Sequence, residues 1–320
     1  MKAEAPYLAE LKATERQIKR QHCLQRACNE LQPGALTRLY LQLPAIGGRA
    51  LCQLAPAYRF MTTPARRRAA QKPALQSRAD LGENGFLVTP NVPKSKKTLY
   101  ILFGGQDGMF FIPSAALLAL LPEGLKDVAV IRSGIQLYYL AGIEGLGRDT
   151  NEVAANLRNK LKTDEYDRVV TIGISVGGLF ALRIADGLGA DVGLSFAAVY
   201  TDGGFWVKDL VNAGSTAFDP LCECMPMRAG RMINVLGSKN ELDVRTSRRI
   251  QNVRRSMLEY HLINSMQHNV LLNLMSSGFA KVFFRLALSR NGAAIRLFAT
   301  LSKIYGFYLV RNIRRLVGRQ

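Results

Sequence analysis

The sequence predicts an α/β protein built on a mostly parallel central sheet with helices on both of its faces. From residue 98 onward, short apolar segments rich in strand-forming residues alternate with segments of helical period. The apolar segments are hydrophobic throughout rather than at every second position, which is typical of strands buried on both faces. Parallel strands joined by crossover helices produce this alternation.

Six segments are expected to form the strands: Thr98–Phe103, Asp127–Ile131, Arg168–Ile172, Leu194–Tyr200, Met232–Leu236 and Tyr260–Ile263. Three segments between them are expected to be helical: Ser114–Leu121, Asn151–Leu161 and Leu179–Leu188. The second of these helices has apolar residues on one face, and Asp149 and Thr150 precede it as candidate N-caps.

Charge divides the chain into three parts. Residues 1–97 hold 17 Lys and Arg against 6 Asp and Glu, and residues 281–320 hold 9 Lys and Arg and no Asp or Glu. Residues 98–280 have a net charge of −1, so the two ends carry essentially all of the net charge of +19. We expect a basic, partly helical N-terminal extension with a linker over 1–97, a catalytic domain over 98–290 and a basic C-terminal helix over 291–320. The ends can meet an anionic membrane or a phosphorylated glycolipid, or be solvated surface without a partner. Nucleic acid is disfavoured, because no zinc pattern or aromatic-basic module accompanies the charge.

The C-terminal segment has two interpretations. Residues 297–316 combine apolar and aromatic residues with Lys and Arg in an amphipathic pattern. Packing of the apolar face on the core is preferred, and peripheral contact with an anionic bilayer is the alternative. The first twenty residues lack the apolar region of a secretory signal, and no apolar run approaches the roughly 20 residues of a transmembrane helix. The sequence therefore predicts a cytoplasmic protein, with contact to the inner face of the membrane as a variant.

The five cysteines do not form a recognisable framework. Their odd number and irregular spacing favour free thiols. Cys222 and Cys224 form a single C-x-C without a second pair, whereas structural zinc takes four ligands. Neither a metal nor a cofactor is expected.

The segment Gly173-Ile174-Ser175-Val176-Gly177 carries the strongest chemical signal. It matches G-x-S-x-G, in which a serine occupies a sharp turn between a strand and a helix. Bulky residues do not fit two positions before or after that serine, and Gly178 leaves further room for the helix to approach the sheet. A phosphate-binding turn is the alternative, but its glycines follow a different order, G-x-G-x-x-G. Ser175 is therefore the predicted nucleophile.

A serine nucleophile needs a base to accept its proton and an acid to orient that base. The base is expected after the last strand, which favours His268 and leaves His261 as the alternative; His22 lies among charges near the N-terminus. The acid is expected after the preceding strand, where Asp243 is the first choice and Glu241 the second. The order serine, acid, histidine along the chain is the one that G-x-S-x-G hydrolases use.

Hydrogen-bond donors for an oxyanion are expected beside the serine. One is the backbone N–H of Val176, and the second is the N–H of Gly105 or Gln106, after the strand that ends at Phe103. A plain turn is the alternative for the Gly104-Gly105 pair.

The chain resembles the α/β-hydrolase superfamily, and within it bacterial hydrolase-like proteins associated with surface-polysaccharide biosynthesis. The stretches that carry the resemblance are LYILFGGQDG, TIGISVGGLFALRIADGLGA, SFAAVY, GSKNELD and QHNVLLNLMSSG, within about 98–290. The resemblance implies the α/β-hydrolase fold and an esterase-like or acyl-transferring enzyme acting on acylated sugars.

The combined expectation is a serine esterase or thioesterase that cleaves an acylated small molecule, sugar or glycolipid. Two alternatives stay open: an acyltransferase that uses the same triad, and a catalytically silent hydrolase-like scaffold at the membrane surface.

Overall fold

In the computed structural model, the residues of this protein that are described are 4–13, 23–24, 27, 33–43, 76–77, 81, 84–105, 110, 112, 114–132, 139, 142–198, 229–241, 243–245, 258–263, 270–276, 278–289, 295–298 and 300. The chain divides into two compact units. One comprises 1–73, 109–122 and 271–285, and the other comprises 74–108, 123–270 and 286–320.

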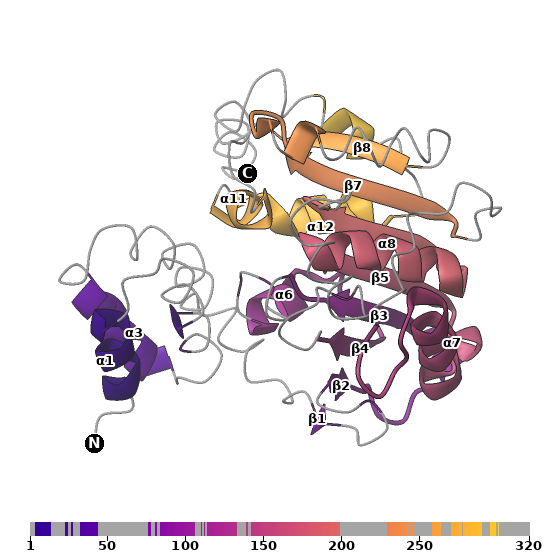
Figure 1. Cartoon of the computed structure of the whole chain (residues 1–320), viewed down its shortest axis with the longest axis horizontal. Helices are drawn as coiled ribbons and strands as arrows, with labels where there is room; N and C mark the ends of the chain where they lie inside the picture. Colours follow the sequence, from indigo (N-terminus) through magenta and orange to yellow (C-terminus); the bar gives the residue numbers. More distant parts are fainter. Residues whose placement is uncertain are drawn as a thin grey trace, which may run out of the picture. The chain divides into compact units, whose positions relative to one another are not determined.

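The larger unit is organised around one sheet (Figure 1). In the described residues it has eight strands, in the order β1-β2-β4-β3-β5-β6-β7-β8. The strands are β1 (Gln76–Ser77), β2 (Gly85–Leu87), β3 (Thr98–Phe103), β4 (Lys126–Ile131), β5 (Arg168–Ile174), β6 (Val192–Phe196), β7 (Arg231–Gly237) and β8 (Leu258–Ile263). The six neighbouring strands β4, β3, β5, β6, β7 and β8 are parallel. Beyond β4, β2 pairs antiparallel with β4, and β1 pairs antiparallel with β2.

These strands confirm the expected mostly parallel sheet. In β3 and β4 every residue after the first is buried, as continuous apolar runs predict for strands covered on both faces. The expected strand over 194–200 begins earlier and ends at Phe196, because Ala197 adopts a left-handed backbone with φ 51° that cannot continue a strand. The strands β1 and β2 precede residue 98, where the catalytic domain was expected to begin.

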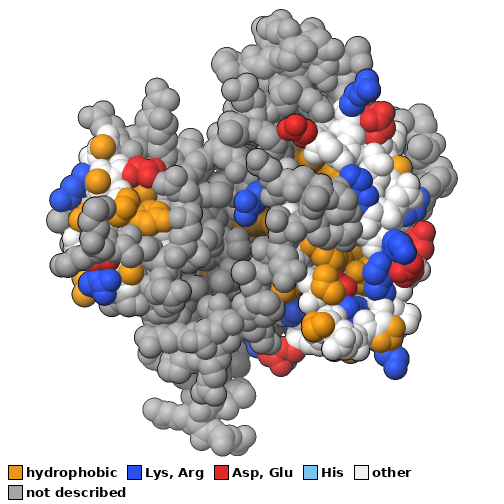
Figure 2. Space-filling view, turned by 90° about the horizontal axis from the view of Figure 1, so that it is seen from below, with side chains coloured by type: hydrophobic (Ala, Val, Ile, Leu, Met, Phe, Trp, Pro, Cys, Tyr) orange, Lys and Arg blue, Asp and Glu red, His pale blue; other side chains and the backbone are white. Residues whose placement is uncertain are grey.

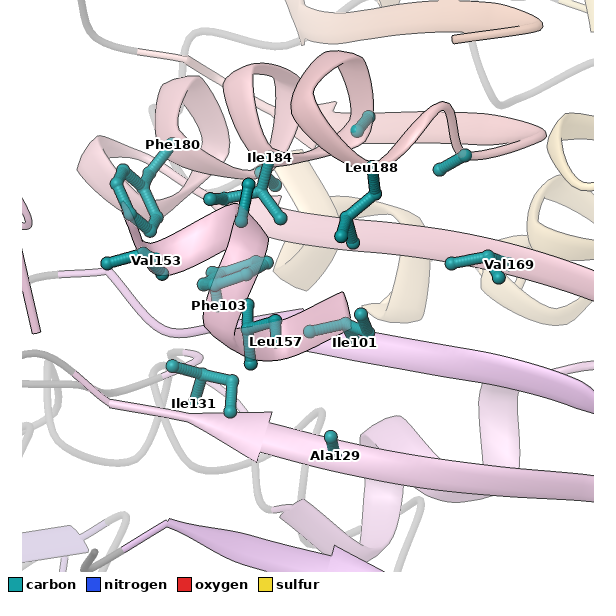
Figure 3. Packing of buried hydrophobic residues seen from close by; sticks show 14 of the residues in the cluster. Ile101, Phe103, Ala129, Ile131, Val153, Leu157, Val169, Phe180, Ile184 and Leu188 are labelled. Atoms are coloured by element: carbon teal, nitrogen blue, oxygen red, sulfur yellow. The ribbon is translucent and has the colours of Figure 1, made fainter. Parts of the chain in front are cut away.

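One face of the sheet is covered by α7 (Thr150–Leu161) and α8 (Val176–Leu188). The Asp149 side chain caps α7 by accepting a 2.9 Å hydrogen bond from the Glu152 N–H, as the sequence predicted. Buried apolar side chains of both helices pack with those of β3, β4 and β5 (Figure 3). The labelled members of this cluster are Ile101, Phe103, Ala129, Ile131, Val153, Leu157, Val169, Phe180, Ile184 and Leu188.

The opposite face of the sheet is buried as well, since Leu102, Val130 and Ile172 are at most 1% exposed. At the amino ends of β5 and β7, two arginines reach carbonyl groups just after residue 286. The Arg168 guanidinium donates to the Leu288 carbonyl at 2.6 Å, and that of Arg231 donates to the Ser289 carbonyl at 2.8 Å. These charge-assisted bonds attach residues 287–289 to the sheet.

A buried ion pair lies near the amino ends of β3 and β4. Lys97 Nζ is 3.1 Å from Asp127 Oδ1, and the Tyr166 hydroxyl donates to Asp127 Oδ2 at 2.8 Å. The Thr89 N–H also donates to Asp127, and the Thr89 carbonyl accepts from Lys97. Such complete hydrogen bonding is what allows two charges to be buried. The two short 3₁₀ helices of this unit are η3 (Lys94–Lys96) and η5 (Thr163–Glu165).

The smaller unit is helical in its described part. Its helices are α1 (Ala5–Ala13), α3 (Pro33–Gln42), α6 (Ser114–Leu120), α11 (Val270–Ser276) and α12 (Ala280–Ala287), the last two reaching its boundaries. A bidentate ion pair joins α3 to the residue before α1. Arg38 donates to both carboxylate oxygens of Glu4, at 2.6 and 3.0 Å. The predicted C-terminal helix lies mostly outside the described residues.

On the face of the molecule shown in Figure 2, Lys and Arg side chains of the described residues are interspersed with Asp and Glu. None of the described helices is long and apolar enough to cross a membrane.

Candidate active site

Ser175 lies at the turn between β5 and α8, at the carboxyl end of the parallel sheet. Its backbone has φ 57° and ψ −122°, a conformation that is unfavourable for residues other than glycine. The Ser175 N–H donates to the Phe196 carbonyl at 2.8 Å, and the Ser175 carbonyl accepts from the Gly178 N–H at 2.9 Å. The serine is thus fixed in a strained turn by β6 on one side and by the first turn of α8 on the other.

The three glycines around Ser175 are required by close contacts. A Cβ on Gly173 would lie 2.8 Å from the Ala181 Cβ, and one on Gly177 would lie 2.7 Å from the Phe103 carbonyl oxygen. A Cβ on Gly178 would likewise overlap the Ser195 hydroxyl oxygen. Side chains at these positions would push α8 away from the sheet, so the G-x-S-x-G-G sequence follows from the packing of the elbow.

The expected oxyanion donors flank this elbow. Val176 is the first residue of α8, where backbone N–H groups have no acceptor within the helix. Gly105 is buried and follows β3 closely, and the preceding Gly104 carbonyl contacts Gly177. The segment after β3 is therefore adjacent to the first turn of α8, as an oxyanion hole needs. Gln106 lies outside the described residues.

The two carboxylates considered as the acid differ in burial. Asp243 follows β7 and is 4% exposed, whereas Glu241 is exposed. The Asp243 N–H donates to the Asn240 side chain at 3.2 Å, which fixes the turn after the strand. A buried carboxylate at the carboxyl end of the sheet suits an acid that orients a histidine, and Asp243 stays the predicted acid.

His268, the predicted base, lies outside the described residues, as does His22. The backbone of His261 lies inside β8, paired with Val235. Strands β6 and β7 separate β8 from β5, which places the two strands roughly 14 Å apart at the usual strand spacing. The backbone of His261 is therefore remote from Ser175, and His268, in the segment that follows β8, stays the predicted base.

Two further residues at this end of the sheet have strained backbones. Tyr139 and Ala197 are non-glycine residues with φ of 67° and 51°. Ala197 directly follows β6, and the Tyr139 hydroxyl contacts the end of β3 through the Gly104 carbonyl. Strain of this kind gathers at functional sites. The sequence carries no signal of the strained backbone at either residue.

No group of three or more His, Cys, Asp and Glu within the described part of the chain could hold a metal ion. Cys222 and Cys224 lie outside that part, and Cys23 is a buried thiol.

No protein-family model matches this chain, and a search of curated proteins returned no match. Among solved structures, the chain is similar to an α/β hydrolase enzyme from the metagenome of sediments of the Mar Chica lagoon, Morocco, with 14% identity and a TM-score of 0.39 over 64% of this chain and 94% of that one. It is also similar to a thermophilic esterase from Thermogutta terrifontis, with 13% identity and a TM-score of 0.38 over 63% of this chain and 89% of that one. A serine hydrolase without a lid from Xanthomonas campestris matches with 15% identity and a TM-score of 0.38 over 61% of this chain and 87% of that one.

At these identities and TM-scores, no residue role is carried over from those enzymes. The fold is identified from the chain's own geometry. Six parallel strands are extended by β2, which runs antiparallel to them, and by β1, which pairs antiparallel with β2. Strand β3 pairs between β4 and β5, and a strained serine joins β5 to α8. The strand order and the elbow together are those of the α/β-hydrolase fold.

Proposed function

We propose that the protein is a serine hydrolase that cleaves an acyl ester or thioester, with Ser175 as nucleophile, His268 as base and Asp243 as the orienting acid. The observation that carries the proposal is the backbone of Ser175, a non-glycine residue with φ 57° at the start of α8. A strained serine at this turn presents its hydroxyl above the carboxyl end of the sheet.

Acylation begins when His268 accepts the proton of the Ser175 hydroxyl while the serine oxygen attacks the acyl carbonyl carbon. The carbonyl oxygen becomes an oxyanion, and the N–H groups of Val176 and Gly105 stabilise it. The carbon–oxygen or carbon–sulfur bond to the leaving group then breaks, and the alcohol or thiol leaves with the proton from His268. The product of this half-reaction is an acyl ester of Ser175.

Deacylation repeats these roles with water as the nucleophile. His268 accepts a proton from water, the hydroxide oxygen attacks the acyl carbon, and Ser175 leaves with the proton that His268 returns. Asp243 keeps the imidazole in one orientation and stabilises its protonated form in both halves. One ester and one water thus yield one carboxylic acid and one alcohol, with every proton transfer assigned to a side chain of this chain.

The substrate class rests on the sequence resemblance. Proteins associated with surface-polysaccharide biosynthesis suggest an acylated sugar or a glycolipid as the acyl donor. The basic segments 1–97 and 281–320 support contact with an anionic membrane or with the phosphate of such a lipid.

The test compares matched variants of the full chain on a panel of short-chain and long-chain p-nitrophenyl esters and acyl thioesters. Ser175→Ala, His268→Ala and Asp243→Asn each lower kcat/KM by about 10³-fold or more. The controls His261→Ala and Glu241→Gln stay within about threefold of wild type. Loss of activity with His261→Ala and retention with His268→Ala would reassign the base.

Addition of sugar alcohols to the same assay separates the two catalytic alternatives. A hydrolase releases the free acid at an unchanged rate, whereas an acyltransferase forms a new ester at the expense of the acid. Folded wild-type protein that releases nothing from any donor would support the silent scaffold instead.

A further inference from the structure

Tyr139 connects the segment after β3 to its neighbours through an internal hydrogen bond. Its side chain is 2% exposed, and its hydroxyl lies 2.9 Å from the Gly104 carbonyl oxygen and 3.2 Å from that of Ile131. The phenol hydroxyl has one hydrogen to donate, so these two carbonyl groups share it as acceptors. Gly104 follows β3 and Ile131 ends β4, so Tyr139 joins the carboxyl ends of two neighbouring strands.

The same Gly104 carbonyl packs against α8. A Cβ on Gly177 would overlap the Gly104 carbonyl oxygen, and the Gly104 carbonyl carbon would be 2.8 Å away. The carbonyl group is therefore held between the Tyr139 hydroxyl and the first turn of α8. In a trans peptide the N–H points opposite to the carbonyl, so the direction of the Gly104 carbonyl sets the direction of the Gly105 N–H.

The Tyr139 ring is held as tightly as its hydroxyl. It stacks on Phe180 of α8 with a centroid distance of 4.7 Å and an interplanar angle of 16°. It also meets Phe103 of β3 edge-on, at 6.0 Å and 82°. This packing and the hydrogen bond together over-determine the residue, which explains why a tyrosine persists at φ 67°.

From this geometry we infer that Tyr139 is a positioning residue for the oxyanion hole. The inference rests on the proposed function. Val176 and Gly105 supply the two donors from different elements, and Tyr139 contacts both elements: its ring packs on α8, and its hydroxyl orients the peptide that contains the Gly105 N–H. Without the hydroxyl, that peptide can rotate and one donor loses its aim at the oxyanion.

The test is Tyr139→Phe, which keeps the stacked ring and removes only the hydroxyl. Tyr166→Phe is the matched control, since it also removes a buried phenol hydroxyl, the one bonded to Asp127 near the amino ends of the strands. Each variant is assayed with the best p-nitrophenyl ester, with a trifluoromethyl ketone that forms a hemiketal oxyanion on Ser175, and by thermal unfolding.

Tyr139→Phe is expected to lower kcat by about 10- to 100-fold with KM within about twofold, because the donor acts on the oxyanion and not on the bound ester. The inhibition constant of the ketone rises by a similar factor. Tyr166→Phe lowers the unfolding temperature but leaves kcat and the inhibition constant within about twofold.

Two results overturn the inference. Either Tyr139→Phe keeps kcat and ketone inhibition within twofold of wild type, or Tyr166→Phe lowers both by the same factor as Tyr139→Phe. Both results presuppose wild-type protein that hydrolyses the ester through Ser175. Wild-type protein that does not would overturn the proposed function itself, and so the two failures are distinguishable.

Discussion

Gly177, in the first turn of α8, lies directly against the carbonyl group of Gly104, which follows β3. The nucleophile elbow and the predicted oxyanion segment are therefore in contact, although 73 positions separate these two glycines in the sequence. Their contact depends on the absence of a side chain at Gly177.

Gly177→Ala should therefore abolish esterase activity and destabilise the fold. The added Cβ meets backbone atoms of Phe103 and Gly104, so β3 or α8 must shift, and we expect a loss of about 2–4 kcal/mol in the free energy of unfolding. The control is Val176→Ala, which retains the proposed N–H donor and should keep kcat/KM within about fivefold. Urea unfolding and ester hydrolysis measure both effects. A stable and active Gly177→Ala protein would contradict this contact between α8 and the end of β3.

Lys97→Met tests the buried ion pair near the amino ends of β3 and β4. Removal of the ammonium group leaves Asp127, which is 1% exposed, without its counter-charge. We expect a loss of about 3–5 kcal/mol in the free energy of unfolding at pH 7. Lys162→Met is the control, because its pair with Glu165 is solvent-exposed and should contribute little to the free energy of unfolding. Equal losses in the two variants would be inconsistent with a structural role for the buried pair.

Ser195→Ala tests a buried hydroxyl beneath the elbow. Ser195 Oγ is fully buried and has no hydrogen-bond partner among the described residues. Its removal should leave the free energy of unfolding unchanged or raise it by up to about 1 kcal/mol. The comparison variant is Thr171→Val, which removes a buried hydroxyl that donates to the Ala181 carbonyl at 2.7 Å and should cost about 1 kcal/mol. A Ser195→Ala variant as destabilised as Thr171→Val would argue for a partner of this hydroxyl.

Tyr100 gives the stability a dependence on alkaline pH. Burial raises the pKa of its phenol to about 12, an effect that the charge of Arg168 partly opposes. In the unfolded chain the same phenol ionises near pH 10. The stabilising contribution of the neutral Tyr100 phenol is therefore complete below pH 10 and is lost as the pH rises towards 12. Between pH 9 and 11 the wild type should lose about 1 kcal/mol more stability than Tyr100→Phe. Identical losses in urea unfolding at the two pH values would contradict the shift.

The central strands could be predicted because each is a continuous apolar run bounded by polar residues. The prediction for β3 was correct at both ends, and those for β4, β5 and β7 differed by one or two residues. The helix α7 was predicted together with its cap, because Asp149 directly precedes an amphipathic period. Local sequence determines these elements, so local patterns reveal them.

Other features depend on tertiary contacts and left no local signal. The strand β2 has three residues, too few for a period, and it exists because it pairs with β4. Tyr139 lies in no motif, and its importance becomes visible only when its hydroxyl is seen beside the Gly104 carbonyl. The burial of Asp243, which distinguishes it from the exposed Glu241, likewise depends on tertiary contacts, although the sequence already favoured Asp243.

The most direct test of the central claim is to locate the adduct of a fluorophosphonate probe on the full-length protein by peptide mass spectrometry. One adduct on Ser175 is expected, and it disappears in Ser175→Ala and in His268→Ala. No adduct on folded wild-type protein, or an adduct that persists in Ser175→Ala, would contradict an activated serine at this elbow.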